Sequence, residues 1–367
     1  MRDFSVIVKA KKAFGHPISL ILIIWFIAVL SRFIRNGEVY GLNYLLFQPD
    51  GSLYQAFTLK LQGFSWSESA AKVNAFYNDQ VGVGYLGATI DPVVQKVISG
   101  RPLLSILSLP FMALFGQYGM LAVPVLSYLF LGVVIYLIGK ELNAEYFSVF
   151  LFLVISLSTS VNRWMVSNLT DGLLVGLIAV LALLLVKKGL GFYLVAIVAL
   201  ALLTRPSGPI VFALLFPFLF TAKRLWVSIA MGLSIVGTIG LALYSPESTG
   251  TQTSGEYTVA NRISDFLIHV IKVIVVEIGQ LVVMDRILFI FLVASTGVAL
   301  YTWRSTWSQS YLLVLAVTFA MGGWNGALGV NFRYQLPVIV PAVAVLLMNY
   351  SLLQSGIRKL LKIPGQN

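Results

Sequence analysis

The stretch ISLILIIWFIAVLSRFI, residues 18–34, decides the fold class of this chain. It carries one charged residue, Arg32, and its 17 residues reach the short end of what a helix needs to cross a bilayer core of about 30 Å. A secretory signal would have a shorter apolar core, followed by small residues at a cleavage site. Neither feature is present, so we expect a first membrane span rather than a cleaved leader.

Apolar runs of this kind recur along the chain, which is 58% hydrophobic and 11% charged, with a mean hydropathy of +0.90. Soluble domains carry about 25% charged residues. We therefore predict an all-α, polytopic transmembrane bundle that forms one integral membrane domain over residues 1–353, followed by a short basic cytoplasmic tail over residues 354–367. The ten predicted spans are 18–35, 118–139, 146–161, 172–186, 190–204, 207–222, 225–244, 287–302, 310–328 and 336–353.

The distribution of charge predicts the orientation of these spans. With ten spans, both termini lie on one side, and that side holds 13 basic and 3 acidic residues, against 12 and 11 on the other. Basic residues concentrate in cytoplasmic loops, so we expect both termini in the cytoplasm. The net charge of +11 is explained by this topology, and we expect no nucleic-acid partner.

Two long segments then fall on the external side, residues 36–117 and 245–286. Loops longer than about 15 residues are uncommon unless they are functional. Inside them, Leu103–Phe115 is too short to cross a membrane and 263–284 carries a stripe of polar residues, so we expect both to lie in the external interface. The segment 263–284 is also long enough to cross, and whether it spans the membrane stays open.

The first external loop contains another expected helix, 52–62. Its Leu53 and Phe57 share an apolar face, whereas Gln55 and Thr58 point elsewhere. We predict an amphipathic interfacial helix. Trp66, Tyr77 and Trp164, also on the external side, are expected to be aromatic anchors at the membrane interface.

Functional chemistry is restricted by composition. The chain has no cysteine and two histidines, which excludes disulfides, a cysteine nucleophile and a multi-histidine metal centre. The polar motifs that remain all fall on the predicted external side. They are QPDGSLY (Asp50, Tyr54), SGRPLL (Arg101), RWMVSNLTDG (Arg163, Asn168, Asp171), LLTRPSGP (Arg205) and VNFRYQLP (Arg333, Tyr334).

In their order, spacing and shared face, these motifs resemble those of the GT-C superfold, the polytopic glycosyltransferases that use a polyprenyl-phosphate sugar. Aminoarabinose transferases and protein mannosyltransferases belong to that group. The resemblance covers roughly residues 15–345 and rests on an acidic residue early in a large first external loop, a second one in the next external loop, an Arg-Pro step and a late Arg-Tyr. It implies an enzyme of the bacterial plasma (inner) membrane with an external active site.

The same resemblance implies roles for individual residues. Asp50 and Asp171 are the expected catalytic carboxylates, and the expected partners are a polyprenyl-phosphate sugar donor, an unidentified acceptor and membrane lipids. No cofactor is certain, and dependence on a divalent metal ion stays open, with Asp50 and Asp171 as its ligands if one is used. Expected to hold the donor phosphate are Arg205, Arg333 and Arg101; expected to line the substrate pocket are Tyr54, Asn168, Arg163 and Tyr334.

Each of these residues also has a simpler interpretation. Asp50 and Asp171 suit the N-terminal cap of a helix, and arginines at a membrane edge can extend their charge to water. For the whole chain, the alternatives are a transporter or flippase of lipid-linked saccharides, an O-antigen polymerase or ligase, and a non-catalytic envelope scaffold. A transporter would place its polar residues at mid-span, whereas those of this chain gather at the external ends.

Overall fold

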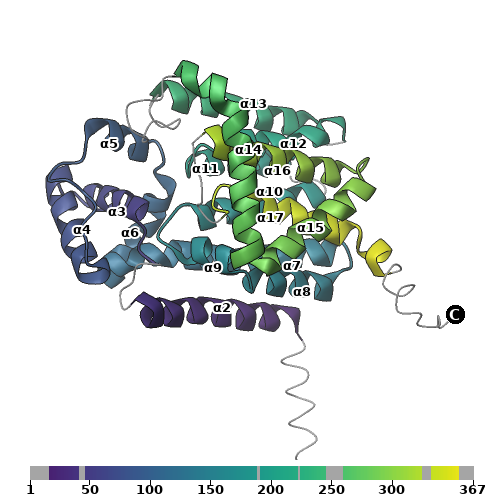
Figure 1. Cartoon of the computed structure of the whole chain (residues 1–367), viewed down its shortest axis with the longest axis horizontal. Helices are drawn as coiled ribbons and strands as arrows, with labels where there is room; N and C mark the ends of the chain where they lie inside the picture. Colours follow the sequence, from purple (N-terminus) through teal and green to yellow (C-terminus); the bar gives the residue numbers. More distant parts are fainter. Residues whose placement is uncertain are drawn as a thin grey trace, which may run out of the picture.

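The computed structural model describes residues 16–40, 46–187, 191–221, 224–244, 259–324 and 332–354, and every regular element within these ranges is a helix. The all-α prediction is confirmed for this part of the chain. The expected tail from residue 355 onward, and residues 245–258 of the second external segment, lie outside it. Figure 1 shows a group formed by α3 to α6 beside a larger bundle of the later helices, with α2 along one edge.

A helix is present at each of the ten segments expected to span the membrane. Besides α2 (Pro17–Tyr40), these helices are α7 (Ala122–Glu141), α8 (Glu145–Ser156) with α9 (Thr159–Val166), α10 (Asp171–Val186), α11 (Gly191–Leu202), α12 (Gly208–Leu215) with the 3-10 helix η2 (Phe216–Phe220), α13 (Arg224–Tyr244), α15 (Arg286–Tyr301), α16 (Thr306–Trp324), and the 3-10 helix η4 (Leu336–Val338) with α17 (Ile339–Met348).

Fewer of these helices have the dimensions of a membrane span. Among the described residues, four runs are long and apolar enough, namely Pro17–Arg35, Leu103–Glu141, Arg224–Leu241 and Asp265–Met284. A fifth span would need α8 and α9 together, but these helices meet at 85°. The other apolar helices have 10–17 residues, where a straight crossing needs about 20. Several helices could therefore span a membrane, while the ten-span topology stays a prediction.

Both segments expected at the interface belong to runs long and apolar enough to cross a membrane. α6 (Leu103–Phe115) continues through the 3-10 helix η1 (Gly116–Leu121) into α7 as one apolar run of 39 residues, about twice the length that one crossing needs. α14 (Val259–Met284) contains a 20-residue stretch that is itself a candidate span.

The helix that positions the site is α10. Fourteen of its 16 residues are buried, because its apolar side chains point in every direction and neighbouring helices cover nearly all of them. Gly172 and Gly176 lie against the backbone of Met165 and Ser127, and small residues of this kind let helices approach closely. The N-terminal end of α10, which begins at Asp171, is consequently enclosed by protein.

The segment predicted to be the first external loop forms a compact helical group of α3 (Pro49–Leu61), α4 (Trp66–Val81), α5 (Pro92–Ser99) and α6. A capping box at Ser65 and Glu68 starts α4: the Ser65 hydroxyl accepts from the Glu68 N–H, while the Glu68 carboxylate accepts from the Ser65 N–H. The Ser65 hydroxyl also donates to the Glu68 carboxylate at 2.7 Å, and this hydrogen bond, together with the one from the Ser65 N–H, holds the pKa of Glu68 below its usual value.

The amphipathic pattern predicted for 52–62 does not describe how α3 packs. Gln55 and Thr58, expected on a different face from Leu53, are fully buried, whereas Leu61 is exposed. The physical reason is that protein covers both sides of α3 and supplies polar partners. Gln55 donates to the Gln117 side chain at 2.8 Å, and the Thr58 hydroxyl donates to a carbonyl oxygen of α3 itself at 2.8 Å.

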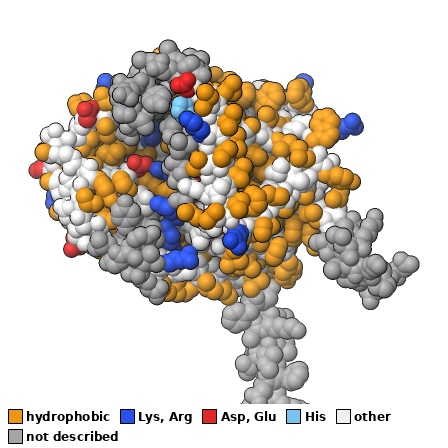
Figure 2. All heavy atoms as spheres, viewed as in Figure 1, with side chains coloured by type: hydrophobic (Ala, Val, Ile, Leu, Met, Phe, Trp, Pro, Cys, Tyr) orange, Lys and Arg blue, Asp and Glu red, His pale blue; other side chains and the backbone are white. Residues whose placement is uncertain are grey.

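Large apolar side chains cover much of the bundle surface in Figure 2. Examples that are more than half exposed are Phe26 and Ile27 on α2, and Val275 and Val283 on α14. Extended apolar surface of this kind marks contact with a membrane or a partner, so it agrees with an integral membrane protein.

The ten-span topology can be tested with reporter fusions. A fusion at Lys188 is expected on the cytoplasmic side and a fusion at residue 250 on the external side. Three predicted spans, 190–204, 207–222 and 225–244, separate the two sites, and an odd number of spans places them on opposite sides. Alkaline phosphatase, which is active outside, and a fluorescent protein that matures inside would give opposite readouts. Both sites on one side would contradict the topology.

Candidate functional site

Four of the five sequence motifs meet in one ion cluster. Asp171, the first residue of α10, accepts from Arg205 Nη1 at its Oδ1 atom and from Arg333 Nε at its Oδ2 atom, the latter at 3.1 Å. Arg333 also donates from Nη1 to Asp50 Oδ2 at 2.8 Å. Asp50 and Arg333 are 283 residues apart in the chain, so the fold alone brings them together. We refer to Asp50, Asp171, Arg205 and Arg333 as the ion cluster.

Burial divides the cluster into an inner and an outer part. The side chain of Asp171 is 1% exposed and that of Arg205 13%, while Arg333 is 18% and Asp50 54% exposed. A buried carboxylate stays charged only when it is paired and hydrogen-bonded, and Asp171 is paired with two guanidinium groups. Asp50, at the outer end, presents its carboxylate to the surroundings.

Both carboxylates lie in the first turn of a helix, but neither is the capping residue. The N-cap of α3 is Gln48 and that of α10 is Thr170, and neither cap side chain bonds to the helix backbone. Anionic side chains in a first turn interact favourably with the positive end of the helix dipole. The capping interpretation is therefore wrong for both residues, whose carboxylates bind arginines instead.

Aromatic side chains surround the guanidinium groups. The Trp164 ring lies 5.2 Å from Arg333 Cζ and 4.8 Å from Arg163 Cζ, and Arg205 Cζ lies 5.1 Å from the Tyr334 ring. Cations within about 6 Å of such a ring are attracted to its face. Arg163 and Tyr334, predicted as pocket residues, thus lie beside the cluster. Trp164 is buried against it, so its prediction as an interface anchor is wrong.

Asn168 connects the cluster to the start of α3. Its Oδ1 atom accepts from the Gln48 N–H at 2.9 Å, and its Nδ2 donates to the Tyr77 hydroxyl at 2.6 Å, which in turn donates to the Gln48 carbonyl oxygen at 3.1 Å. A side chain at Gly51 would collide with Asn168. Because Asn168 is fully buried, its role in this structure is to position α3 and thereby Asp50.

Tyr77 was predicted to be an interface anchor, and this is also wrong. Its ring is fully buried in α4, and burial raises the pKa of its hydroxyl above the ordinary value. The hydroxyl consequently remains a neutral donor to Gln48. The sequence held no signal for this role, because the three groups come from segments that are distant in the chain.

Two predicted site residues, Tyr54 and Arg101, are not members of the ion cluster. Tyr54 is buried one turn after Asp50, and its carbonyl oxygen accepts from the Ser105 hydroxyl at 3.0 Å, which ties α3 to α6. Arg101 lies in the turn before α6, where its backbone N–H donates to the Ile98 carbonyl oxygen at 2.9 Å.

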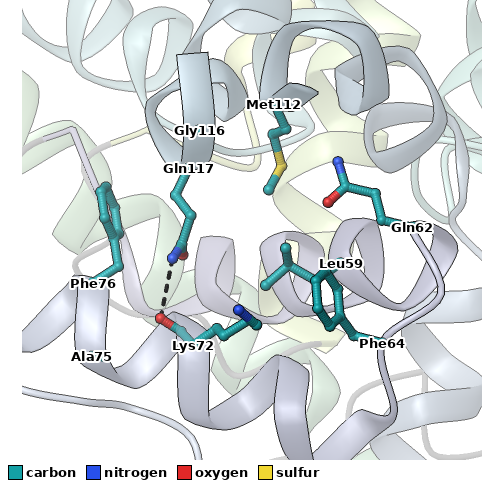
Figure 3. A pocket seen from close by; sticks show the side chains of 9 residues that line it. All are labelled: Leu59, Gln62, Phe64, Lys72, Ala75, Phe76, Met112, Gly116 and Gln117. Carbon is teal, nitrogen blue, oxygen red and sulfur yellow. Dashed lines mark hydrogen bonds between the residues drawn. The ribbon is translucent and has the colours of Figure 1, made fainter. Parts of the chain in front are cut away.

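A separate pocket of about 530 Å³ opens at the opposite end of α3 (Figure 3). It is about 18 Å along the helix from Asp50, at 1.5 Å per residue. Its walls combine apolar side chains with two glutamines and one lysine, whose ammonium group lies 4.7 Å from the centre of the Phe64 ring. The residues that line it are Leu59, Gln62, Phe64, Lys72, Ala75, Phe76, Met112, Gly116 and Gln117.

The ion cluster does not fit a divalent metal ion. Among the described residues there is no group of three or more acidic, histidine or cysteine side chains that could hold one. Asp50 and Asp171 share the Arg333 guanidinium between them, and a dication between the carboxylates would have to displace that cation. The two positive charges of the arginines already balance both acids.

We expect Asp171 and Asp50 to differ in their contribution to stability. Asp171→Ala leaves two arginines without their buried partner, so the free energy of unfolding should fall by about 3–5 kcal/mol. Asp50→Ala breaks an ion pair whose acidic side is exposed, and should cost about 1 kcal/mol or less. Denaturant unfolding of purified protein in detergent measures both values, and equal losses would contradict the division into inner and outer parts.

We also expect divalent metal ions to leave stability unchanged. A ligand that binds the folded state raises the melting temperature, so Mg²⁺ or Mn²⁺ added after chelation should cause no shift beyond that of potassium chloride at equal ionic strength. A saturable rise in the wild type that disappears in Asp50→Asn would show that the carboxylates do bind a metal ion.

Comparisons of the chain with protein-family models, with curated proteins and with solved structures give no match. The functional argument below consequently rests on the residues of the ion cluster and on their geometry.

Proposed function

We propose that this chain is a membrane-embedded glycosyltransferase of the GT-C type, which transfers a sugar from a polyprenyl-phosphate donor to an acceptor on the external face of the bacterial plasma membrane. The observation that carries the proposal is the ion cluster. Two carboxylates and two arginines from four distant segments converge at the ends of helices, with one carboxylate exposed and the others enclosed. Charged groups near a membrane usually mark a functional site.

In this proposal, Asp50 is the general base. The acceptor hydroxyl gives its proton to the Asp50 carboxylate while its oxygen forms a bond to the anomeric carbon. The bond from that carbon to the phosphate oxygen breaks, and polyprenyl phosphate leaves with the electron pair. Because attack and departure occur on opposite faces of the sugar, the configuration inverts, as in inverting glycosidases.

Arg205 and Arg333 bind the donor phosphate and stabilise its charge as it leaves. Guanidinium groups pair with phosphate oxygens in a bidentate geometry, and fixed positive charges that face a developing negative charge lower the barrier. Asp171 holds both arginines in place from the buried side. The two acids thus have different roles, because their environments differ.

The Asp50–Arg333 pair suggests how the donor activates the base. The bond from Arg333 to Asp171 is buried, whereas the bond to Asp50 involves an acid that is more than half exposed, and exposed ion pairs contribute only about 0–1 kcal/mol. An arriving phosphate can therefore replace the Asp50 carboxylate on Nη1 at low cost. The exchange releases Asp50 toward the acceptor once the donor is bound.

The apolar part of the donor requires a lipid-facing surface close to the site. α6 packs beside α3, and its first turns, tied to Tyr54 through Ser105, carry Ile106 and Leu107, which are 47% and 41% exposed. This surface suits an isoprenoid chain whose phosphate reaches the ion cluster at the start of α3.

Asp50→Asn tests the mechanism through two opposite effects. Transfer of a labelled sugar should fall by about 10²–10⁴-fold, the usual contribution of a general base. Binding of sugar-free polyprenyl phosphate should become tighter, by up to about fivefold, because the competing carboxylate is gone. Radiolabel transfer and binding titrations in nanodiscs give the two values.

Asp79→Asn is the matched control, since Asp79 is an exposed acid of the same external segment outside the cluster. It should leave both transfer and binding unchanged. Wild-type turnover by Asp50→Asn would exclude Asp50 as the base. Donor that crosses the membrane without being consumed would favour a flippase instead.

A further inference from the structure

The turn that carries Arg333 has an unusual backbone conformation. Phe332 has a φ of 64°, in the left-handed region, although it is not a glycine. The other such residue in the described ranges is Asn143, with φ 54°, and asparagine is a residue type that tolerates this region. A bulky phenylalanine does not, so its surroundings must impose the conformation.

A buried carboxylate of α14 supplies this restraint. Glu277 is fully buried, and its Oε2 atom accepts a hydrogen bond from the Phe332 N–H at 2.6 Å. Glutamate is almost never fully buried unless it is paired. The hydrogen bond gives one Glu277 oxygen a partner and fixes the direction of the peptide group that leads into Arg333.

Glu277 is itself held in a defined place. α14 packs against α16 (Figure 1), and a side chain at Gly323 of α16 would collide with the backbone of Val270 on α14. The close approach of these helices leaves little room for α14 to shift. The Phe332 ring is fully buried as well.

We propose that Glu277 is a positioning residue for the ion cluster. By holding Phe332 in the left-handed conformation, it aims Arg333 so that Nε reaches Asp171 and Nη1 reaches Asp50 at the same time. The two contacts require one direction of the Arg333 side chain, and that direction is set by the backbone at residues 332 and 333. α14, which lies outside all five motifs, thus becomes part of the site.

The catalytic consequence rests on the proposed function, but the placement of Arg333 does not. If Glu277 is a positioning residue, a change at Glu277 acts on the site only through Arg333. A merely structural residue would affect the site whether or not the Arg333 guanidinium is present. In a chain that lacks the Arg333 guanidinium, a change at Glu277 should therefore have no further effect on the site. A double-mutant cycle detects this dependence.

The test uses Trp164 as a local reporter, because its ring lies 5.2 Å from Arg333 Cζ. Trp164 is one of seven tryptophans, so its emission is isolated by subtracting the spectrum of the same variant carrying Trp164→Phe. The variants are Glu277→Leu, Glu277→Asp, Glu277→Gln, Arg333→Ala and Arg333→Ala with Glu277→Leu, each as the full chain in nanodiscs.

We expect Glu277→Leu to change the Trp164 emission as Arg333→Ala does, and the double variant to match Arg333→Ala alone. Glu277→Gln keeps an acceptor oxygen and should resemble the wild type. Glu277→Asp withdraws the acceptor by one methylene group and should shift the emission partway, which keeps the test valid if Glu277→Leu does not fold.

Where transfer activity is detected, Glu277→Leu should reduce it by roughly 10- to 100-fold, the usual loss when an outer partner of a functional group is removed. Wild-type Trp164 emission in both Glu277→Leu and Glu277→Asp would overturn the proposal. So would an additional change of equal size in the Arg333→Ala background. If the emission pattern is as expected but the wild type transfers no sugar, the proposed function is rejected while the positioning role of Glu277 is retained.

Discussion

The arrangement of the site depends on one buried carboxylate. Asp171 begins α10, a helix covered by protein on all sides, and its side chain is almost completely enclosed. A charge in that position is stable only with partners of opposite charge. Its partner Arg205 lies in the turn after α11, and its partner Arg333 lies in the turn before α17. The need to pair the buried Asp171 carboxylate therefore restricts where the turns that carry Arg205 and Arg333 can lie.

A second set of contacts places the other acid at the edge of this buried pair. Asn168, Tyr77 and Gln48 join the loop before α10 to the start of α3, and Asp50 follows two residues after Gln48. Its carboxylate reaches Arg333 from the exposed side. Two carboxylates that share one arginine thus occupy different environments, and different environments give acids different roles. Asp171 holds the arginines, and Asp50 remains accessible.

Much of the helical architecture could be predicted from the sequence, because long apolar runs bounded by charged residues leave few alternatives to helices. The predicted bounds of Leu103–Phe115 coincide with those of α6. The packing of α3 could not be predicted in this way. Gln55 and Thr58 appear polar in any periodicity analysis, yet both are buried because other segments cover them. The number of membrane crossings is likewise not decided by helix positions, since several of the helices are shorter than a bilayer core is thick.

By itself, the sequence determined the all-helical class, the apolar character and the residue types available for chemistry: acids, arginines and aromatic rings, without cysteine. It also indicated all four residues of the ion cluster, because charged residues are rare in so apolar a chain. Only the tertiary structure decided that they share one site and which acid is buried. It also brought in Tyr77, Trp164 and Glu277, whose roles depend on contacts across as many as 169 residues, as between Trp164 and Arg333. Burial and hydrogen-bond partners determine what a side chain does, and both are properties of the folded chain rather than of any local stretch.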